Sequence, residues 1–95
     1  MKIVELKPGM RRVDIIAKVQ DVGQSREVTT RTGEQSRVAD AVVSDESGTV
    51  KLTLWNEQID QVKANNTVKI ENGYVTSFRG ETQLNVGRYG KLTVE

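Results

Sequence analysis

With 95 residues, of which 36% are hydrophobic and 28% charged, the chain has the length and composition of one small globular domain, residues 1–95. The formal net charge of +1 hides an uneven distribution, because residues 1–39 carry +3, residues 40–60 carry −4 and residues 61–95 carry +2. The absence of cysteine and histidine excludes disulfides, thiol nucleophiles, the usual zinc sites and Ser–His or Cys–His pairs. We therefore expect no catalytic residues, no metal and no cofactor.

The chain shows no sign of a membrane segment. No apolar stretch approaches the roughly 18 residues that a span requires, and Glu5 stands where a signal peptide needs apolar residues. We expect a cytoplasmic protein with no membrane role. The basic outer segments allow a local nucleic-acid-binding patch, although ordinary mixed surface charge explains the same counts.

Most of the apolar residues alternate with period two, which indicates strands. In chain order we expect a strand at residues 13–19 that ends at Gly23, followed by a polar loop or mobile hairpin tip at 24–36. Strands at 38–44 and 50–55 then flank a turn at 45–48, and a short helix at 56–63, capped by Asn56, follows. The chain ends with a strand at 67–78, a tight turn at Arg79-Gly80, a strand at 81–86 and a short tail at 92–94 that pairs at an edge.

Five strands with a short helix between the third and the fourth predict an all-β OB-fold, a small, partly open Greek-key barrel. A five-stranded SH3-like barrel is the nearest alternative, but it does not normally place a helix at that point. The OB-fold is the better prediction.

Strand parity assigns the only tryptophan to a face. In the strand at 50–55 the apolar residues at positions 50, 52 and 54 must face the core, so Lys51, Thr53 and Trp55 face outward. Burying Trp55 instead would expose two leucines.

The strand at 67–78 begins with apolar residues inward at positions 68 and 70, and regular alternation would then point Val75 to solvent. Glycine inside a strand often marks a bulge. One extra residue at Gly73 turns Val75 inward and Tyr74 and Phe78 outward. In the last strand, Gln83 and Asn85 face outward by the same reasoning.

The predicted outer face thus carries three of the four aromatic residues among polar and basic neighbours. The aromatic residues are Trp55, Tyr74 and Phe78, and the neighbours are Lys51, Thr53, Arg79, Gln83, Asn85 and Arg88. A base stacked on an aromatic ring contributes about 1–3 kcal/mol, and nearby cations engage phosphates. Packing in the core is the alternative for these rings. Arg26, Arg31 and Arg37 of the polar loop are candidate further contacts, and solvated charge explains them equally well.

Five stretches of the chain are characteristic: LKPGM at residues 6–10, DESGTVKLTLW at 45–55, VKIENGY at 68–74, TSFRG at 76–80 and QLNVG at 83–87. In these stretches the chain closely resembles the single-OB-fold single-stranded DNA-binding proteins of archaea and their eukaryotic relatives in the sensor-of-single-stranded-DNA complex. The resemblance implies that Trp55, Tyr74 and Phe78 stack against bases. Archaeal members often carry tryptophan at the position of Tyr74, so the smaller ring puts the affinity in doubt.

Residues and resemblance together predict a non-enzymatic, nucleoid-associated protein that binds single-stranded DNA without sequence specificity, during replication, recombination or repair. It is expected to be a monomer in isolation, with replication or repair proteins as further partners. Two alternatives stay open: an RNA-binding OB module, and an OB subunit whose aromatic face docks a protein. A metal-dependent hydrolase using Asp40, Asp45 and Glu46 is the weakest option, because no nucleophile or base accompanies them.

Overall fold

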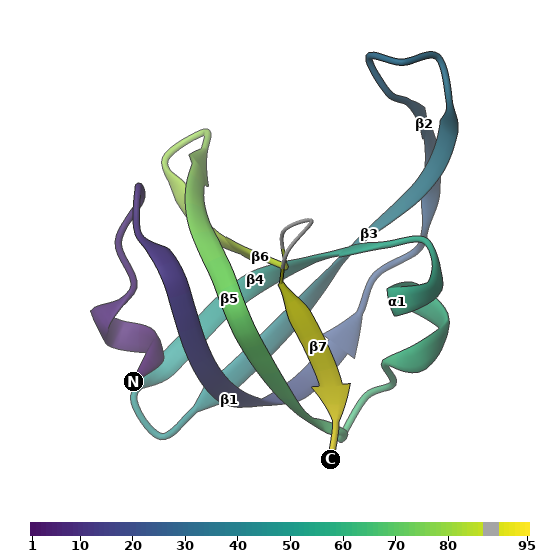
Figure 1. Cartoon of the computed structure of the whole chain (residues 1–95). Helices are drawn as coiled ribbons and strands as arrows, with labels where there is room; N and C mark the ends of the chain where they lie inside the picture. The colour runs from purple at the N-terminus through teal and green to yellow at the C-terminus, as the bar shows by residue number, and fades with distance from the viewer. Residues whose placement is uncertain (87–89) are drawn as a thin grey trace.

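The structure, a computed structural model, describes residues 1–86 and 90–95, and of residue 78 the backbone alone. Along these residues the elements are η1, a 3-10 helix (Ile3–Glu5), the strands β1 (Arg11–Val22), β2 (Arg26–Thr29), β3 (Gln35–Asp45) and β4 (Gly48–Trp55), the helix α1 (Glu57–Gln61), and the strands β5 (Thr67–Phe78), β6 (Glu81–Asn85) and β7 (Lys91–Val94) (Figure 1). No helix in this part of the chain is long and apolar enough to cross a membrane.

Five of the strands form a closed barrel in the order β1-β3-β4-β6-β5, and β5 closes it by pairing with β1. The β4–β6 pair is parallel, and the other pairs are antiparallel. Helix α1 connects the third barrel strand, β4, to the fourth, β5. The predicted OB-fold, with its helix between the third and fourth strands, is therefore confirmed.

The short strand β7 extends the sheet beside the barrel strand β6. β7 pairs with the first half of β5, from Val68 to Glu71, while β6 pairs with the second half, from Tyr74 to Phe78. β6 and β7 thus follow one another along the same edge of β5. This confirms that the tail near residues 92–94 pairs at an edge.

The segment predicted as a polar loop or a mobile hairpin tip, residues 24–36, forms a hairpin that contains β2 and the start of β3. β2 pairs with the start of β3, from Arg26 opposite Val38 to Thr29 opposite Gln35, and this hairpin projects beyond the barrel (Figure 1). Gly33, with φ of +84°, makes the turn, and the Thr30 amide donates to the carbonyl of Glu34. Both faces of this hairpin are polar, so the apolar alternation that marks a half-buried strand is missing.

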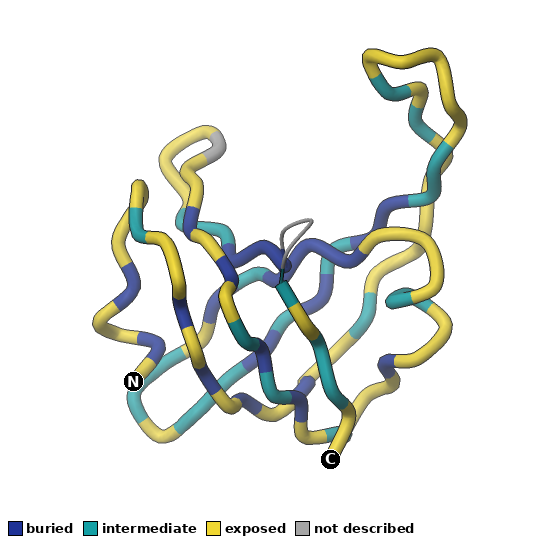
Figure 2. The backbone as a smooth tube through the Cα atoms, viewed as in Figure 1, coloured by how far each residue is buried: buried dark blue, intermediate teal, exposed yellow. Residues whose placement is uncertain are grey.

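The core lies inside the barrel and follows strand parity (Figure 2). Its largest fully buried side chains are Leu52, Leu54, Ile70 and Leu84. Ile3 and Leu6 at the N-terminal end and Val62 after α1 join the same cluster. Alternation along β1, β4 and β6 therefore predicts the core correctly.

Asn56 does not cap α1 as the sequence predicts. Its backbone φ is +48°, and its side chain makes no capping bond. The Oδ1 atom instead accepts a hydrogen bond from the backbone amide of Arg37 at 2.9 Å, and the Asn56 amide donates to the carbonyl of Arg37 at 2.9 Å. These two bonds extend the β3–β4 pairing beyond Trp55.

The predicted register shift at Gly73 is confirmed. Ile15 of β1 pairs with Ile70 and Val13 pairs with Gly73, so β5 advances three residues while β1 advances two. The extra residue is Asn72, with φ of +56°, whose amide donates to Oδ1 of Asp14 at 2.9 Å. The shift buries Val75 and turns Tyr74 outward.

We expect Gly73→Ala to destabilise the fold. A Cβ at this position would lie 2.9 Å from the Asn85 carbonyl oxygen and 3.0 Å from Cγ2 of Ile70. Crowding of this kind costs about 1–3 kcal/mol, and urea unfolding should show a loss of that size. Gly48→Ala is the matched control, since nothing lies within 4 Å of its Cβ. Equal stability of the two variants would contradict this account of the bulge.

Asp45 ties the N-terminal segment to the β3–β4 turn, and this tie should depend on pH. Its carboxylate accepts from the Ser47 hydroxyl and from the amides of Ile3 and Gly48, among others, which lowers its pKa from 3.8 to about 2. The contribution of Asp45 to stability is present above about pH 3.8 and is lost as the pH falls through about 2. Asp45→Asn should therefore lower the melting temperature at pH 7, with the difference from the parent shrinking toward pH 2. A constant difference would contradict this assignment.

Candidate nucleic-acid interface

An open groove of about 510 Å3 crosses the outer face of β3, β4 and β6. The β2–β3 hairpin rises on one side of it and the β5–β6 hairpin on the other (Figure 1). The groove is lined by Arg26, Val38, Asp40, Lys51, Thr53, Trp55, Arg79, Glu81, Gln83 and Asn85. Seven of these ten were predicted as binding residues from the sequence.

Cross-strand pairing brings the groove residues into rows. One row runs from Asp40 on β3 through Thr53 on β4 and Asn85 on β6 to Tyr74 on β5. Residues that are paired directly across a sheet point to the same face. The row therefore places hydrogen-bonding groups between the aromatic positions of β4 and β5.

The floor of the groove is less accessible than strand parity suggests. Thr53 and Asn85 belong to the predicted outward set, yet they are only 8% and 7% exposed. Nδ2 of Asn85 donates to the Thr76 hydroxyl at 3.0 Å. Strand parity assigns a side chain to a face of the sheet, but it does not reveal how far the neighbours on that face cover it.

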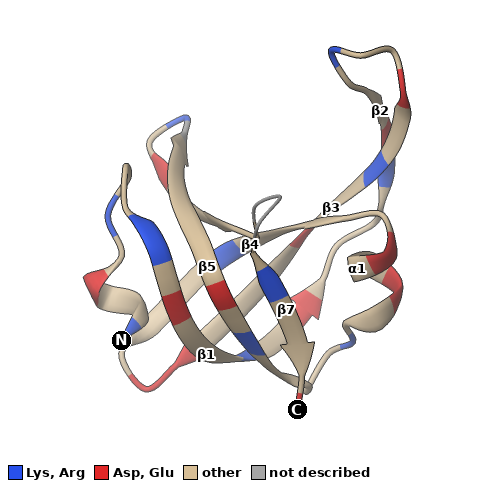
Figure 3. Ribbon diagram, viewed as in Figure 1, with Lys and Arg blue, Asp and Glu red and all other residues tan. Residues whose placement is uncertain are grey.

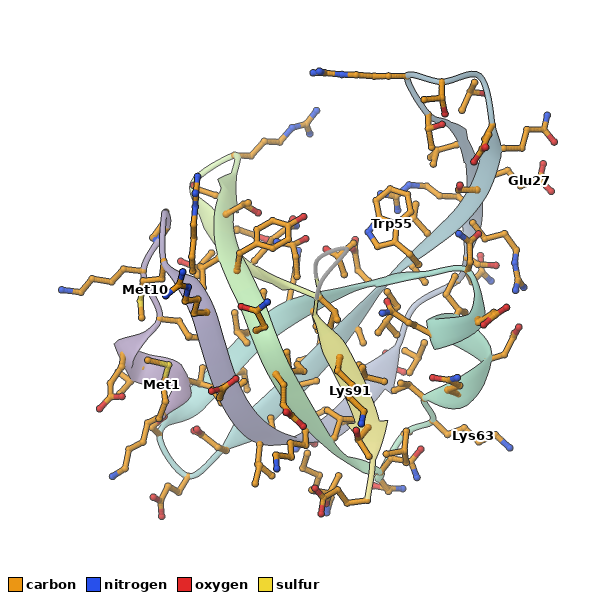
Figure 4. The ribbon with its side chains drawn as sticks, viewed as in Figure 1. Met1, Met10, Glu27, Trp55, Lys63 and Lys91 are labelled. Atoms are coloured by element: carbon orange, nitrogen blue, oxygen red, sulfur yellow. The ribbon has the colours of Figure 1, made fainter. Side chains whose placement is uncertain are left out.

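Trp55 lies at the end of β4 and lines the groove, with 37% of the residue exposed. Figure 4 shows its ring beside the β2–β3 hairpin. The Trp55 amide donates to Oε1 of Gln58 at 3.0 Å, and Val38 pairs with Trp55 across the sheet. The strand end that carries the indole is thus held on both sides.

Tyr74 is exposed to 39% but lies outside the lining of the groove. It borders a second hollow, which is lined by Pro8, Gly9, Met10, Arg11, Tyr74, Val75, Thr76 and Ser77. Two other predicted contacts, the side chain of Phe78 and the whole of Arg88, fall outside the described residues. Trp55 therefore lines the groove, whereas Tyr74 lines the second hollow.

Three of the predicted cationic contacts form ion pairs with carboxylates. Lys51 Nζ lies 2.5 Å from Glu81, Arg37 lies 2.8 Å from Asp60, and Arg26 lies 3.9 Å from Asp40. The hydrogen bond that Lys51 donates to Glu81 raises the pKa of Lys51, and the hydrogen bond that Arg37 donates to Asp60 raises the pKa of Arg37. Arg31 is exposed near the hairpin turn, and Arg79 lines the groove.

Sequence reasoning missed Val38 and the two groove carboxylates, Asp40 and Glu81, as surface-forming residues. Asp40 was considered only as a metal ligand. The missing information is pairing across strands: Asp40 lies opposite Thr53, and Glu81 reaches Lys51 from the adjacent strand. Acidic and basic residues are consequently mixed around the groove (Figure 3).

The three acidic residues considered as metal ligands, Asp40, Asp45 and Glu46, each contact other groups of the protein. Within the residues that the structure describes, no group of three or more Asp and Glu side chains is placed to hold an ion. The Asp45 carboxylate is engaged by the turn and by Ile3, and Glu46 forms an ion pair with Lys2 at 3.5 Å.

Comparison with known proteins identifies the family of this chain. The model of a family described as "Single-stranded DNA binding protein Ssb-like, OB fold" matches residues 6–94. The chain is 38% identical over 91 residues to the single-stranded DNA binding protein Ssb of Saccharolobus solfataricus, a match that covers 96% of this chain and 61% of that protein. It is 30% identical over 97 residues to replication factor A of Methanothermobacter thermautotrophicus, covering 96% of this chain and 12% of that protein.

Solved structures share the fold. The second OB-fold domain of replication protein A from Methanococcus maripaludis superposes with a TM-score of 0.81 at 25% identity, covering 99% of this chain and 92% of that one. An OB domain from Thermoplasma acidophilum gives a TM-score of 0.86 at 20% identity, covering 100% and 85% of the two chains. The chain thus covers most of each of these two OB domains but less than two thirds of the length of the Ssb relative.

Proposed function

Because the chain belongs to the Ssb-like family of OB-fold single-stranded DNA binding proteins, we propose that it binds single-stranded DNA in the groove between its two hairpins. The observation that carries this proposal is the partly exposed Trp55 in a groove with polar and cationic side chains. OB-folds bind oligonucleotides on this face, between the loop that joins barrel strands 1 and 2 and the loop that joins strands 4 and 5. In this chain those loops are the β2–β3 hairpin and the β5–β6 turn.

In this proposal bases stack on Trp55, Tyr74 and Phe78. Every base has a flat π-face, so stacking binds strands of any sequence. Duplex DNA keeps its bases inside and offers only its charge to the groove. The expected result is a preference for single strands with little preference among sequences.

Backbone and edge contacts supply the rest. Lys51, Arg79 and Arg88 engage phosphates, while Thr53, Gln83 and Asn85 donate or accept hydrogen bonds at bases and sugars. Arg26, Arg31 and Arg37 of the hairpin side add contacts where the strand leaves the groove. Since Thr53 and Asn85 are nearly buried, they act only on a base that has entered the groove.

The cellular role that follows is protection of exposed strands during replication, recombination or repair, with replication or repair proteins as partners. The same stacking surface also suits RNA, because RNA bases have the same flat π-faces. The comparison of DNA with RNA is therefore part of the test. Binding of a protein partner in place of nucleic acid is the outcome that would replace this proposal.

We expect oligo-dT to quench the fluorescence of Trp55, the only tryptophan in the chain. The quenching should weaken with added salt and should be absent with matched duplex DNA. In anisotropy titrations, Trp55→Ala should weaken binding about 5- to 150-fold, the equivalent of losing one stacked base. Trp55→Phe, which keeps a ring, should weaken it less. An unchanged spectrum with no binding to DNA or RNA would contradict the proposal.

The Lys51–Glu81 ion pair should limit both the affinity for single-stranded DNA and the salt dependence of that binding. A phosphate that approaches Lys51 must displace Glu81, and the freed carboxylate then attracts a cation from solution. Glu81→Gln should therefore tighten binding to oligo-dT about two- to fivefold at low salt and steepen the salt dependence. The charge-matched control is Glu57→Gln, an exposed acid of α1 outside the groove. Equal effects of the two variants would mean that total charge, and not the ion pair, sets the affinity.

A further inference from the structure

The strongest feature outside the groove is a second bulge, located in β1. Arg11 pairs with Tyr74 and Val13 pairs with Gly73, so β1 advances two residues while β5 advances one. The extra residue is Arg12, with φ of +56°. A long side chain rarely adopts this conformation, and such strain tends to persist where it serves a function.

The bulge decides where Arg11 points. Val13 is fully buried, and regular alternation would turn residue 11 inward as well. The extra residue instead places Arg11 directly opposite Tyr74, on the outward face of the sheet. Bulges are known to re-aim side chains in this way next to functional sites. Two adjacent bulges, at Arg12 and at Asn72, thus bring Arg11 and Tyr74 to the same surface.

Arg11 and Tyr74 both line the second hollow, which measures about 360 Å3. Its other wall is the segment from Pro8 to Met10, and this wall is held in place by backbone hydrogen bonds. The Gly9 amide donates to the carbonyl of Val75 at 2.9 Å, and the Val75 amide donates to the carbonyl of Met10 at 2.9 Å. Backbone pairing with β5 therefore fixes this wall of the hollow.

Charge separates this hollow from the main groove. Lys51 and Arg26 in the groove face carboxylates, whereas Arg11 forms no ion pair within residues 1–86 and 90–95. Figure 3 shows basic residues at the start of β1. A phosphate can reach Arg11 without displacing an acidic partner.

We propose that this hollow is a second binding subsite, which continues the path of the DNA strand from the groove across β5 onto β1. Asn85 on the groove floor pairs with Tyr74, and Tyr74 pairs with Arg11, so the two sites are contiguous. Tyr74 stacks the base that passes between them, and Arg11 binds the phosphate beyond it. The subsite rests on the proposed function, and it accounts for nucleotides past the two hairpins.

The test compares Arg11→Gln with Lys18→Gln, an equal change of charge at the other end of β1. With oligo-dT of about 12 nucleotides, Arg11→Gln should weaken binding about two- to fivefold. It should also lower the salt slope by about 0.7, the value for one phosphate contact in a single strand. Arg11→Lys should restore the slope. Lys18→Gln should change neither quantity, and equal effects of Arg11→Gln and Lys18→Gln would overturn the subsite.

A proximity measurement completes the test. The chain has no cysteine, so Arg11→Cys and Lys18→Cys each carry a thiol-linked photocrosslinker at one defined position. Crosslinking of oligo-dT at position 11 and its absence at position 18 support the subsite. Crosslinking at neither position, together with intact quenching of Trp55 by the same oligonucleotide, overturns the subsite and leaves the proposed function standing. If the parent protein did not bind oligo-dT at all, the proposed function itself would be wrong.

Discussion

The pairing of β5 with β1 is the constraint on which the rest of the structure depends. β5 must close the barrel with Val68 and Ile70, and it must also carry an aromatic ring to the outer surface a few residues later. Regular alternation cannot do both, because it would point Tyr74 into the core and Val75 to solvent. The bulge at Asn72 resolves the conflict, and the missing side chain of Gly73 lets the carbonyl of Asn85 approach closely. The bulge at Asn72 and Gly73 therefore determines both which residues of β5 join the core and which face outward.

The groove has a floor of barrel strands and walls formed by two hairpins. The inner faces of these strands pack in the core, and this packing holds the strands that carry Thr53 and Asn85. The cationic side chains around it are largely engaged with carboxylates before any ligand arrives. Such a surface has little net charge to attract nucleic acid unspecifically, and most of its binding energy must come from stacking and from exchange of ionic partners. This arrangement suits discrimination between single strands and duplex DNA.

Much of this architecture could be predicted from the sequence, and the exceptions have physical causes. Alternation in β1, β4 and β6 predicts the core, and the same logic with one glycine predicts the outward turn of Tyr74. For residues 24–36 the sequence predicts a loop or a hairpin tip without locating its strands, because both faces of the β2–β3 hairpin are solvated and its strands have no apolar period. The capping role expected of Asn56 was wrong because a positive φ angle directs its side chain back to Arg37. Asp40 and Glu81 were missed because a groove wall is made by pairing across strands, which one sequence does not display.

The central claim is that single-stranded nucleic acid binds to the groove and to the surface that carries Trp55 and Tyr74. Mapping of chemical-shift changes by NMR tests this claim most directly. Titration with oligo-dT should shift the Trp55 indole signal and the amides of Gln83 and Asn85, with the Tyr74 amide moving alongside them. The amides of Ile16 and Lys18, on the far part of β1, should keep their positions. Shifts concentrated around Ile16 and Lys18, or a spectrum that oligo-dT leaves unchanged, would contradict the account.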